Sequence, residues 1–121
     1  MQYKVVKFLK ILIAELEDLD EDIKILITKC EEQHLHEEIS QYVFLENLAV
    51  LKNELFGVEG FIEEVRNISK EEFDSLKELK DFLLKNLAQR IKEKGLVHSI
   101  LPLVERKLNK VELYLEHQSE N

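Results

Sequence analysis

The sequence is poor in residues that interrupt helices and in residues that cross-link a chain. Its 121 residues include 3 glycines, 1 proline, 1 cysteine and no tryptophan. A single cysteine, Cys30, excludes a disulfide within the chain and fits a reducing compartment. Because helix breakers are scarce while Leu, Glu and Lys are abundant, the composition predicts an all-α protein.

Long uncharged apolar runs are also missing. No stretch reaches the roughly 18 residues that a membrane-spanning helix needs, so we expect no such helix. The N-terminal stretch is apolar, but Lys10 interrupts it, and acidic residues stand where a signal peptide would have its cleavage site. We therefore expect a cytoplasmic protein with no membrane association.

Positive charge is in deficit, since the formal net charge is −8 at pH 7. Nucleic-acid binding depends on neutralising phosphates with Lys and Arg, so a nucleic-acid partner is not expected. The length fits a single domain over residues 1–121 and suffices for a sizeable core.

Four segments carry apolar residues at alternating spacings of four and three, the period of packed helices. We predict helices over residues 3–33, 37–67, 70–94 and 99–117. Short joints make neighbouring helices antiparallel, so the sequence predicts an up-down-up-down four-helix bundle.

The joints differ in how clearly the sequence marks them. Ser69 and Glu72 form an S-x-x-E capping box at the start of the third helix, and Gly95 marks its end. Ser99 can cap the fourth helix, with Pro102 in its first turn. The first joint, near residues 34–36, has neither Gly nor Pro. The alternative is therefore a fused rod of about 90 Å, which would need a dimer to cover its apolar stripe.

Gly57 and Gly60 lie inside the second predicted helix, whose apolar period continues through them. With Leu55, Val58 and Ile62 facing the core, the two glycines are predicted on the outer side. Three outcomes are open: a bend, a break before a short helix over residues 59–67, or a bare groove where a partner helix docks.

Catalytic patterns are not found in the sequence. A di-metal bundle needs two Glu-x-x-His pairs, and only Glu31 with His34 forms one. Neither a Gly-x-Ser-x-Gly turn nor a phosphate-binding glycine loop occurs. We expect a protein that is not an enzyme.

A site for a metal ion or a small ligand is the alternative function. The predicted topology brings the first and third joints to one end of the bundle, where His34, His36 and His98 would gather. Cys30 lies one turn before His34 on the same helix face. Cys30, His34 and His98 are thus candidate ligands for zinc or a similar ion. Otherwise Cys30 is a small core residue and the histidines are solvated.

The main functional prediction is a protein–protein interaction module, such as an adaptor, small chaperone or complex subunit. Apolar residues exceed what one packing stripe needs, and surplus apolar surface marks interfaces. A homodimer or a protein partner is therefore expected, and the candidate interface residues are Ile11, Ile25, Val43, Val50, Gly57 and Gly60. The acidic segment 15–22 is interpreted as a solvated helix face, or alternatively as a site for a basic partner.

Overall fold

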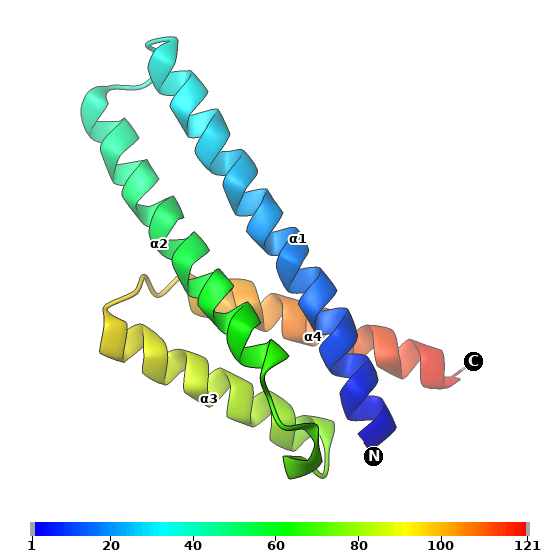
Figure 1. Ribbon diagram of the computed structural model, residues 1–121. Coiled ribbons are helices and arrows are strands. Elements are labelled where there is room, and N and C mark those ends of the chain that lie inside the picture. The colour runs from blue at the N-terminus through cyan, green and yellow to red at the C-terminus, as the bar shows by residue number, and fades with distance from the viewer. Residues whose placement is uncertain (1, 121) are drawn as a thin grey trace.

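The computed structural model describes residues 2–120, with the side chains of residues 3–118, and this part of the chain is all-α. It contains α1 (Gln2–Leu35), α2 (Gln41–Arg66), α3 (Leu76–Lys94) and α4 (Ile100–Glu120), with a short 3₁₀ turn, η1 (Lys70–Glu72), between α2 and α3. The predicted four-helix bundle is confirmed (Figure 1).

The helices are arranged as two antiparallel pairs of unequal length. α1 and α2 form a long hairpin, and α3 and α4 cross the half of that hairpin that carries the N-terminus (Figure 1). α1 has 34 residues and α3 has 19, which correspond to about 51 Å and about 29 Å of helix. The hairpin therefore extends well beyond the helices that pack on it. We call this extension, residues 24–56, the arm.

The hydrophobic core lies where the two pairs overlap. The buried apolar side chains of α1 run from Val5 to Ile23, and those of α2 run from Val58 to Val65. Within the arm, Cys30 is the one side chain that is fully buried. The other half of the core consists of side chains from α3, α4 and the joints: Phe73, Leu79, Leu83, Leu87, Ile91, Leu96, Ile100, Val104, Leu108, Val111 and Leu115.

The turn between α1 and α2 excludes the fused rod and lies at residues 36–40, slightly later than predicted. The amide of Glu38 donates to the carbonyl of Gln33 at 2.8 Å, and the amide of Glu37 to that of His34 at 3.1 Å. This is the Schellman arrangement, with Glu37 left-handed at φ 58. Ser40 then caps α2 by accepting from the amide of Val43. This turn contains no Gly that would reveal it in the sequence.

The predicted start of the third helix is wrong, because the helix begins at the second of two S-x-x-E motifs, Ser75 to Glu78. Ser69 makes no side-chain cap and precedes η1, whereas Ser75 accepts from the amide of Glu78 at 3.1 Å and begins α3. Between the two serines, Phe73 has an extended backbone and is buried in the core. Burying Phe73 requires the chain to leave the helical path, so the second capping box starts the helix.

The joint between α3 and α4 agrees with the prediction and is fastened to α2. Gly95 ends α3 in the left-handed conformation at φ 62, and α4 begins directly after Ser99. The amide of Val97 donates to Asn53 Oδ1 at 2.8 Å, and the hydroxyl of Ser99 donates to Glu54 Oε2 at 2.7 Å. These two bonds fix the joint beside the arm's lower end.

α2 continues unbroken through both glycines, but their predicted place on the outer side is wrong. Gly57 is buried, and a Cβ at this position would overlap Cδ1 of Ile100. A Cβ at Gly60 would lie 2.8 Å from a guanidinium nitrogen of Arg90. The prediction assumed that α2 buries one apolar stripe. In the structure α2 contacts α1 on one side and α3 and α4 on another. The bare backbone is a docking site for helices of the same chain.

Candidate functional site

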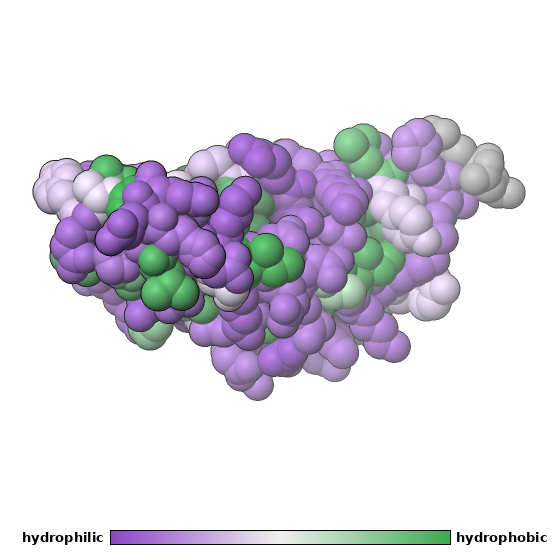
Figure 2. All heavy atoms as spheres, turned by 90° about the horizontal axis from the view of Figure 1, so that it is seen from above, coloured by the Kyte–Doolittle hydropathy of each residue, from purple (hydrophilic) through white to green (hydrophobic). Residues whose placement is uncertain are grey.

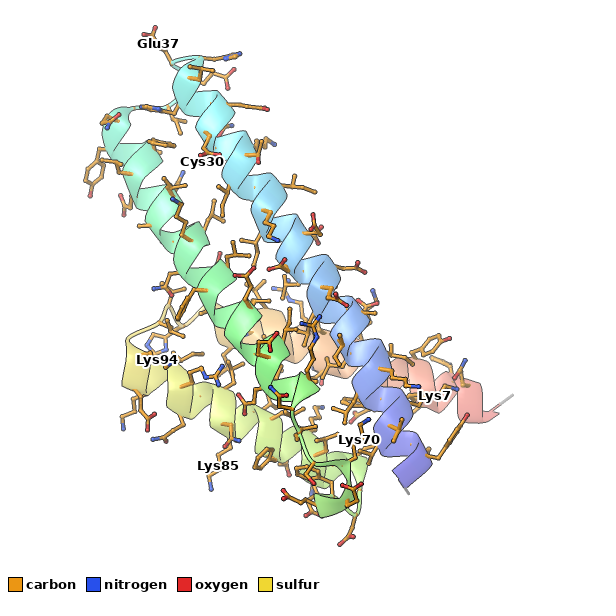
Figure 3. All side chains as sticks on the ribbon, viewed as in Figure 1. Lys7, Cys30, Glu37, Lys70, Lys85 and Lys94 are labelled. Atoms are coloured by element: carbon orange, nitrogen blue, oxygen red, sulfur yellow. The ribbon has the colours of Figure 1, made fainter. Side chains whose placement is uncertain are left out.

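Two of the three predicted metal ligands are engaged in packing between α1 and α2. Cys30 lies between these helices (Figure 3), with its Sγ 4.0 Å from the carbonyl oxygen of Phe44. The ring of His34 stacks on Phe44, with centroids 4.0 Å apart and planes inclined by 12°. His34 Nε2 is 2.6 Å from Gln41 Oε1. Both side chains therefore hold the arm's two helices together.

His98 does not join them. It belongs to the joint that is bonded to Asn53 and Glu54, whereas His34 lies beside Gln41 and Phe44. About ten residues of α2 separate the two levels, which is about 15 Å along the helix. The first and third joints do point the same way, but the longer hairpin carries its own joint further. Across residues 2–120, no group of three or more His, Cys, Asp or Glu side chains could hold a metal ion.

The acidic segment 15–22 is used partly inside the molecule. Glu15 Oε1 accepts from Lys107 at 3.0 Å and from Lys110 at 2.9 Å, which ties α1 to α4. The hydrogen bonds of Lys110 and Lys107 lower the pKa of Glu15 below its ordinary value. Glu17 pairs with Arg66 of α2 at 3.3 Å. The segment thus secures the crossing of helices, and a basic partner for its remaining carboxylates stays a prediction.

A second electrostatic feature lies between α1 and α2. Lys24 Nζ is 2.9 Å from Asp20 Oδ2 and 4.0 Å from Glu59 Oε2, so two carboxylates share one ammonium group. Partial burial and the neighbouring Asp20 raise the pKa of Glu59. Asp20 Oδ1 is buried without a hydrogen-bond partner within the described part of the chain. This cluster lies at the foot of the arm.

Most of the exposed apolar surface belongs to the arm. Of the twelve large apolar side chains that are exposed in the described part of the chain, the arm contributes eight, and viewed from above green patches lie among the purple polar surface (Figure 2). The arm's members are Ile25, Leu26, Leu35, Tyr42, Val43, Leu45, Val50 and Phe56. Among the predicted interface residues, Ile25, Val43 and Val50 are in this set. Ile11 is half-buried against the core, and the two glycines are covered by α3 and α4.

One face of the arm is hollowed. A groove of about 560 Å³ runs between the hairpin and α4, and a second hollow of about 410 Å³ continues along the α1–α2 seam. Leu26 lines both, so the two hollows adjoin, and we call them together the arm groove. Its upper part is lined by Leu26, Lys29, Cys30, Gln33, Asn47, Val50 and Leu51, and its lower part by Leu19, Asp22, Ile23, Glu54, Leu103, Arg106, Lys107 and Lys110.

The sequence did contain a signal for the arm groove. The predicted helices over residues 3–33 and 37–67 are longer than the two that follow, so part of the hairpin must lack cover from them. Leu26 and Leu51 continue the four-three spacing of Ile23 and Leu55, so the apolar period alone places them in the core. Their apolar period is correct, but the period does not report how many helices share it.

Comparison of the chain with protein-family models, with curated proteins and with solved structures gave no significant match. No helix in residues 2–120 combines the length and the apolar character that crossing a membrane requires.

Proposed function

We propose that this protein is a non-enzymatic protein–protein interaction module whose docking element is the arm, and that the partner contributes a helix that lies in the arm groove. One observation carries the proposal: the apolar seam between α1 and α2 continues beyond α4 with no further helix over it. Leu26, Val50 and Leu51 line that uncovered stretch. An apolar channel of this kind is stabilised when an amphipathic helix covers it.

The form of the groove suits a helix. Its two walls are the antiparallel helices α1 and α2, and the α2 part of the arm from Gln41 to Phe56 is about 24 Å long, which matches about four turns of a partner helix. Lys29, Gln33 and Asn47 lie at its edges and can bond to polar groups of a partner. The interior is apolar and the rim is polar, as in protein interfaces generally.

The metal-binding alternative has lost its support, because Cys30 and His34 pack against α2 and His98 lies elsewhere. The absence of an enzymatic activity, a cytoplasmic location and the lack of a nucleic-acid partner remain predictions from composition and motifs.

The proposal is tested by affinity capture from the native host with mass spectrometry, using three versions of the tagged protein. Val50→Lys places a charge on the groove face at a side chain that is 41% exposed. Leu45→Lys is the matched control, since Leu45 lies on the same helix and is 52% exposed. The step of five residues from Leu45 to Val50 turns the helix by about 140°, so Leu45 points away from the groove.

We expect bound proteins, including added untagged copies of the chain, to be retained by wild type and by Leu45→Lys and to be lost with Val50→Lys. A buried lysine without a partner costs more than the apolar contact that it replaces, so the loss should be about tenfold or greater. Equal capture by both variants would show that the arm groove is not the docking element.

A further inference from the structure

We infer that the helix in the arm groove comes from a second copy of this chain, and that the two arms pair antiparallel with each tip against the partner's α4. This inference rests on the proposed function, because it names the occupant of the same groove. Three features of the surface support it: a continuous apolar stripe, unpaired charges of opposite sign at the two ends, and a groove that α4 lines only in its lower part.

The apolar stripe on α2 is covered by α4 at one end and exposed along the rest of its length. Val43, Val50 and Gly57 recur every seven residues and therefore lie on one face of α2. α4 covers that face at Gly57 through Ile100, whereas Val50 is 41% and Val43 is 40% exposed. A helix lying beside α4 would extend the same layer over the rest of the stripe. The uncovered face thus continues an interface that the chain already makes.

Each end of the arm groove carries charge that has no ion pair within the same copy. At the lower end, Lys107 and Lys110 pair with Glu15, and Asp22 and Glu54 also line the channel, so the cation without an ion pair within the described residues is Arg106. At the far end, Glu37 and Glu38 form the turn, where Glu37 projects from the tip (Figure 3). Neither carboxylate has an ion pair within residues 2–120. Each copy therefore presents an acidic tip and, at the lower end of the groove, the guanidinium of Arg106, which can pair with the tip of a second copy at two equivalent contacts of a symmetric dimer.

The shape of the groove selects the antiparallel arrangement. Side chains of α4 line the lower part of the channel, whereas α1 and α2 alone line its upper part. Parallel arms would bring the two α4 helices into the same space. Antiparallel arms place each tip in the space beside the partner's α4, so that Glu37 and Glu38 of each copy lie near the partner's Arg106. A two-fold axis then crosses the middle of the groove, near Lys29 and Asn47.

The size of the face predicts a weak dimer. An arm face about 24 Å long and about 18 Å wide, from helix rise and interaxial spacing, presents roughly 400 Å² in projection. Stable complexes usually bury about 800 Å² per partner. We therefore expect a dissociation constant in the micromolar range, so the measurement must span low to high micromolar concentrations.

Sedimentation velocity of the full chain over that range tests the inference. Wild type should pass from monomer to dimer as concentration rises. Val50→Lys should weaken the dimer by about tenfold or more, because it places a charge at the centre of the pairing face. Leu45→Lys should leave the dissociation constant unchanged, and circular dichroism should show equal helix content for all three proteins.

A charge-reversal cycle tests the antiparallel geometry independently of apolar contacts. Arg106→Glu alone, or Glu37→Lys with Glu38→Lys, makes both tip contacts repulsive and should weaken the dimer several-fold at low salt. Combining all three substitutions restores opposite charges at both contacts and should return the dissociation constant close to that of wild type. Additive weakening in the combined variant would overturn the tip-to-α4 pairing.

A monomer at every concentration would overturn the dimer, as would a dimer that Val50→Lys leaves intact. These outcomes are distinct from failure of the proposed function. If the chain stays monomeric while Val50→Lys still abolishes capture of another protein, the groove docks a different partner. If Val50→Lys changes neither self-association nor capture, both the inference and the proposed function fail.

Discussion

Asp20 and Glu59 place two carboxylates at the contact between α1 and α2, where a single ammonium group, Lys24, lies near both. The pKa of Glu59 is raised by partial burial and by Asp20, so the fold favours its protonated form more than the unfolded chain does. Glu59 therefore supports the fold below its unfolded pKa, ordinarily 4.5, and this support is lost as pH rises through the folded value.

Glu59→Gln should stabilise the protein at pH 7 and leave it nearly unchanged at about pH 3.5, where glutamate is protonated in both states. The amide can donate to the buried, unpartnered Oδ1 of Asp20, and it removes a like-charge contact. Because Glu59 is half-exposed, the gain should be modest, about 0.5 kcal/mol in the free energy of unfolding. Urea unfolding at the two pH values measures it.

The matched control is Glu46→Gln, which neutralises an exposed α2 carboxylate that has no ion pair in the described part of the chain. It should change the free energy of unfolding by less than the error of the measurement at both pH values. A gain for Glu59→Gln that is equal at both pH values, or a loss at pH 7, would contradict the shared-ammonium explanation.

Gly57 should be less tolerant of alanine than Gly60, although both lie within one helix. A Cβ at Gly57 overlaps Cδ1 of the fully buried Ile100 and lies 3.2 Å from its Cγ1. Overpacking costs roughly 1–3 kcal/mol, against about 1 kcal/mol gained in helix propensity. Gly57→Ala should therefore lower the free energy of unfolding by about 1 kcal/mol. Gly60→Ala meets only the far end of the long Arg90 side chain, which can shift, and should be neutral or stabilising in the same denaturation experiment.

Ile100→Val removes the methyl group that Gly57→Ala would contact, and this makes the explanation specific. Alone it should cost about 1 kcal/mol, as such core substitutions do. The double variant should be more stable than the sum of the single effects by about 1 kcal/mol, because each change relieves the other. Strict additivity of the two costs would show that Gly57→Ala acts through something other than Ile100.

At the scale of the helices, the apolar period predicted their number and most of their boundaries. Gly95 ended α3 as expected, because a left-handed glycine has a local cause, and α4 begins after Ser99 with Pro102 in its first turn, also as expected. The Ser99 hydroxyl, which was predicted to cap α4, donates to Glu54 of α2. The Glu37 turn was not locatable, since a glutamate adopts the left-handed conformation only where tertiary packing holds it there. Ser69 and Ser75 each begin an S-x-x-E motif, and the burial of Phe73 between them favours the helix start at Ser75.

The candidate sites were harder to predict than the helices, because they depend on how far each helix extends along its neighbour. His34 and His98 lie toward the same end of the bundle but at different heights along α2, since the α1–α2 hairpin extends beyond the joint of α3 and α4. Val43 and Val50 were predicted as interface residues from their place outside the seam, and they do lie on an uncovered face. Gly57 lies on that same face and is covered, which only the position of α4 determines.

At the scale of the whole molecule, the two halves of the hairpin are held by different amounts of packing. The lower half is enclosed by α3 and α4 and contains nearly all buried side chains of α1 and α2. The arm is held by its own two-helix seam, with Cys30 and the stacked pair of His34 and Phe44 near its far end. Helices draw most of their stability from tertiary packing, so the arm should open without unfolding the rest.

Hydrogen exchange of amides along α2 tests this division within one continuous helix. In a dilute sample, amides at residues 45–55 should be at least about tenfold less protected than those at residues 58–65, because opening the arm exposes little of the core. Uniform protection along α2 would show that the arm opens only when the whole molecule unfolds.

At high concentration, pairing of the arms should increase the protection of residues 45–55 in wild type and in Leu45→Lys, but not in Val50→Lys. Since a lysine at Val50 leaves the helix intact while removing the pairing face, that difference would separate protection by a second copy from protection by the fold itself.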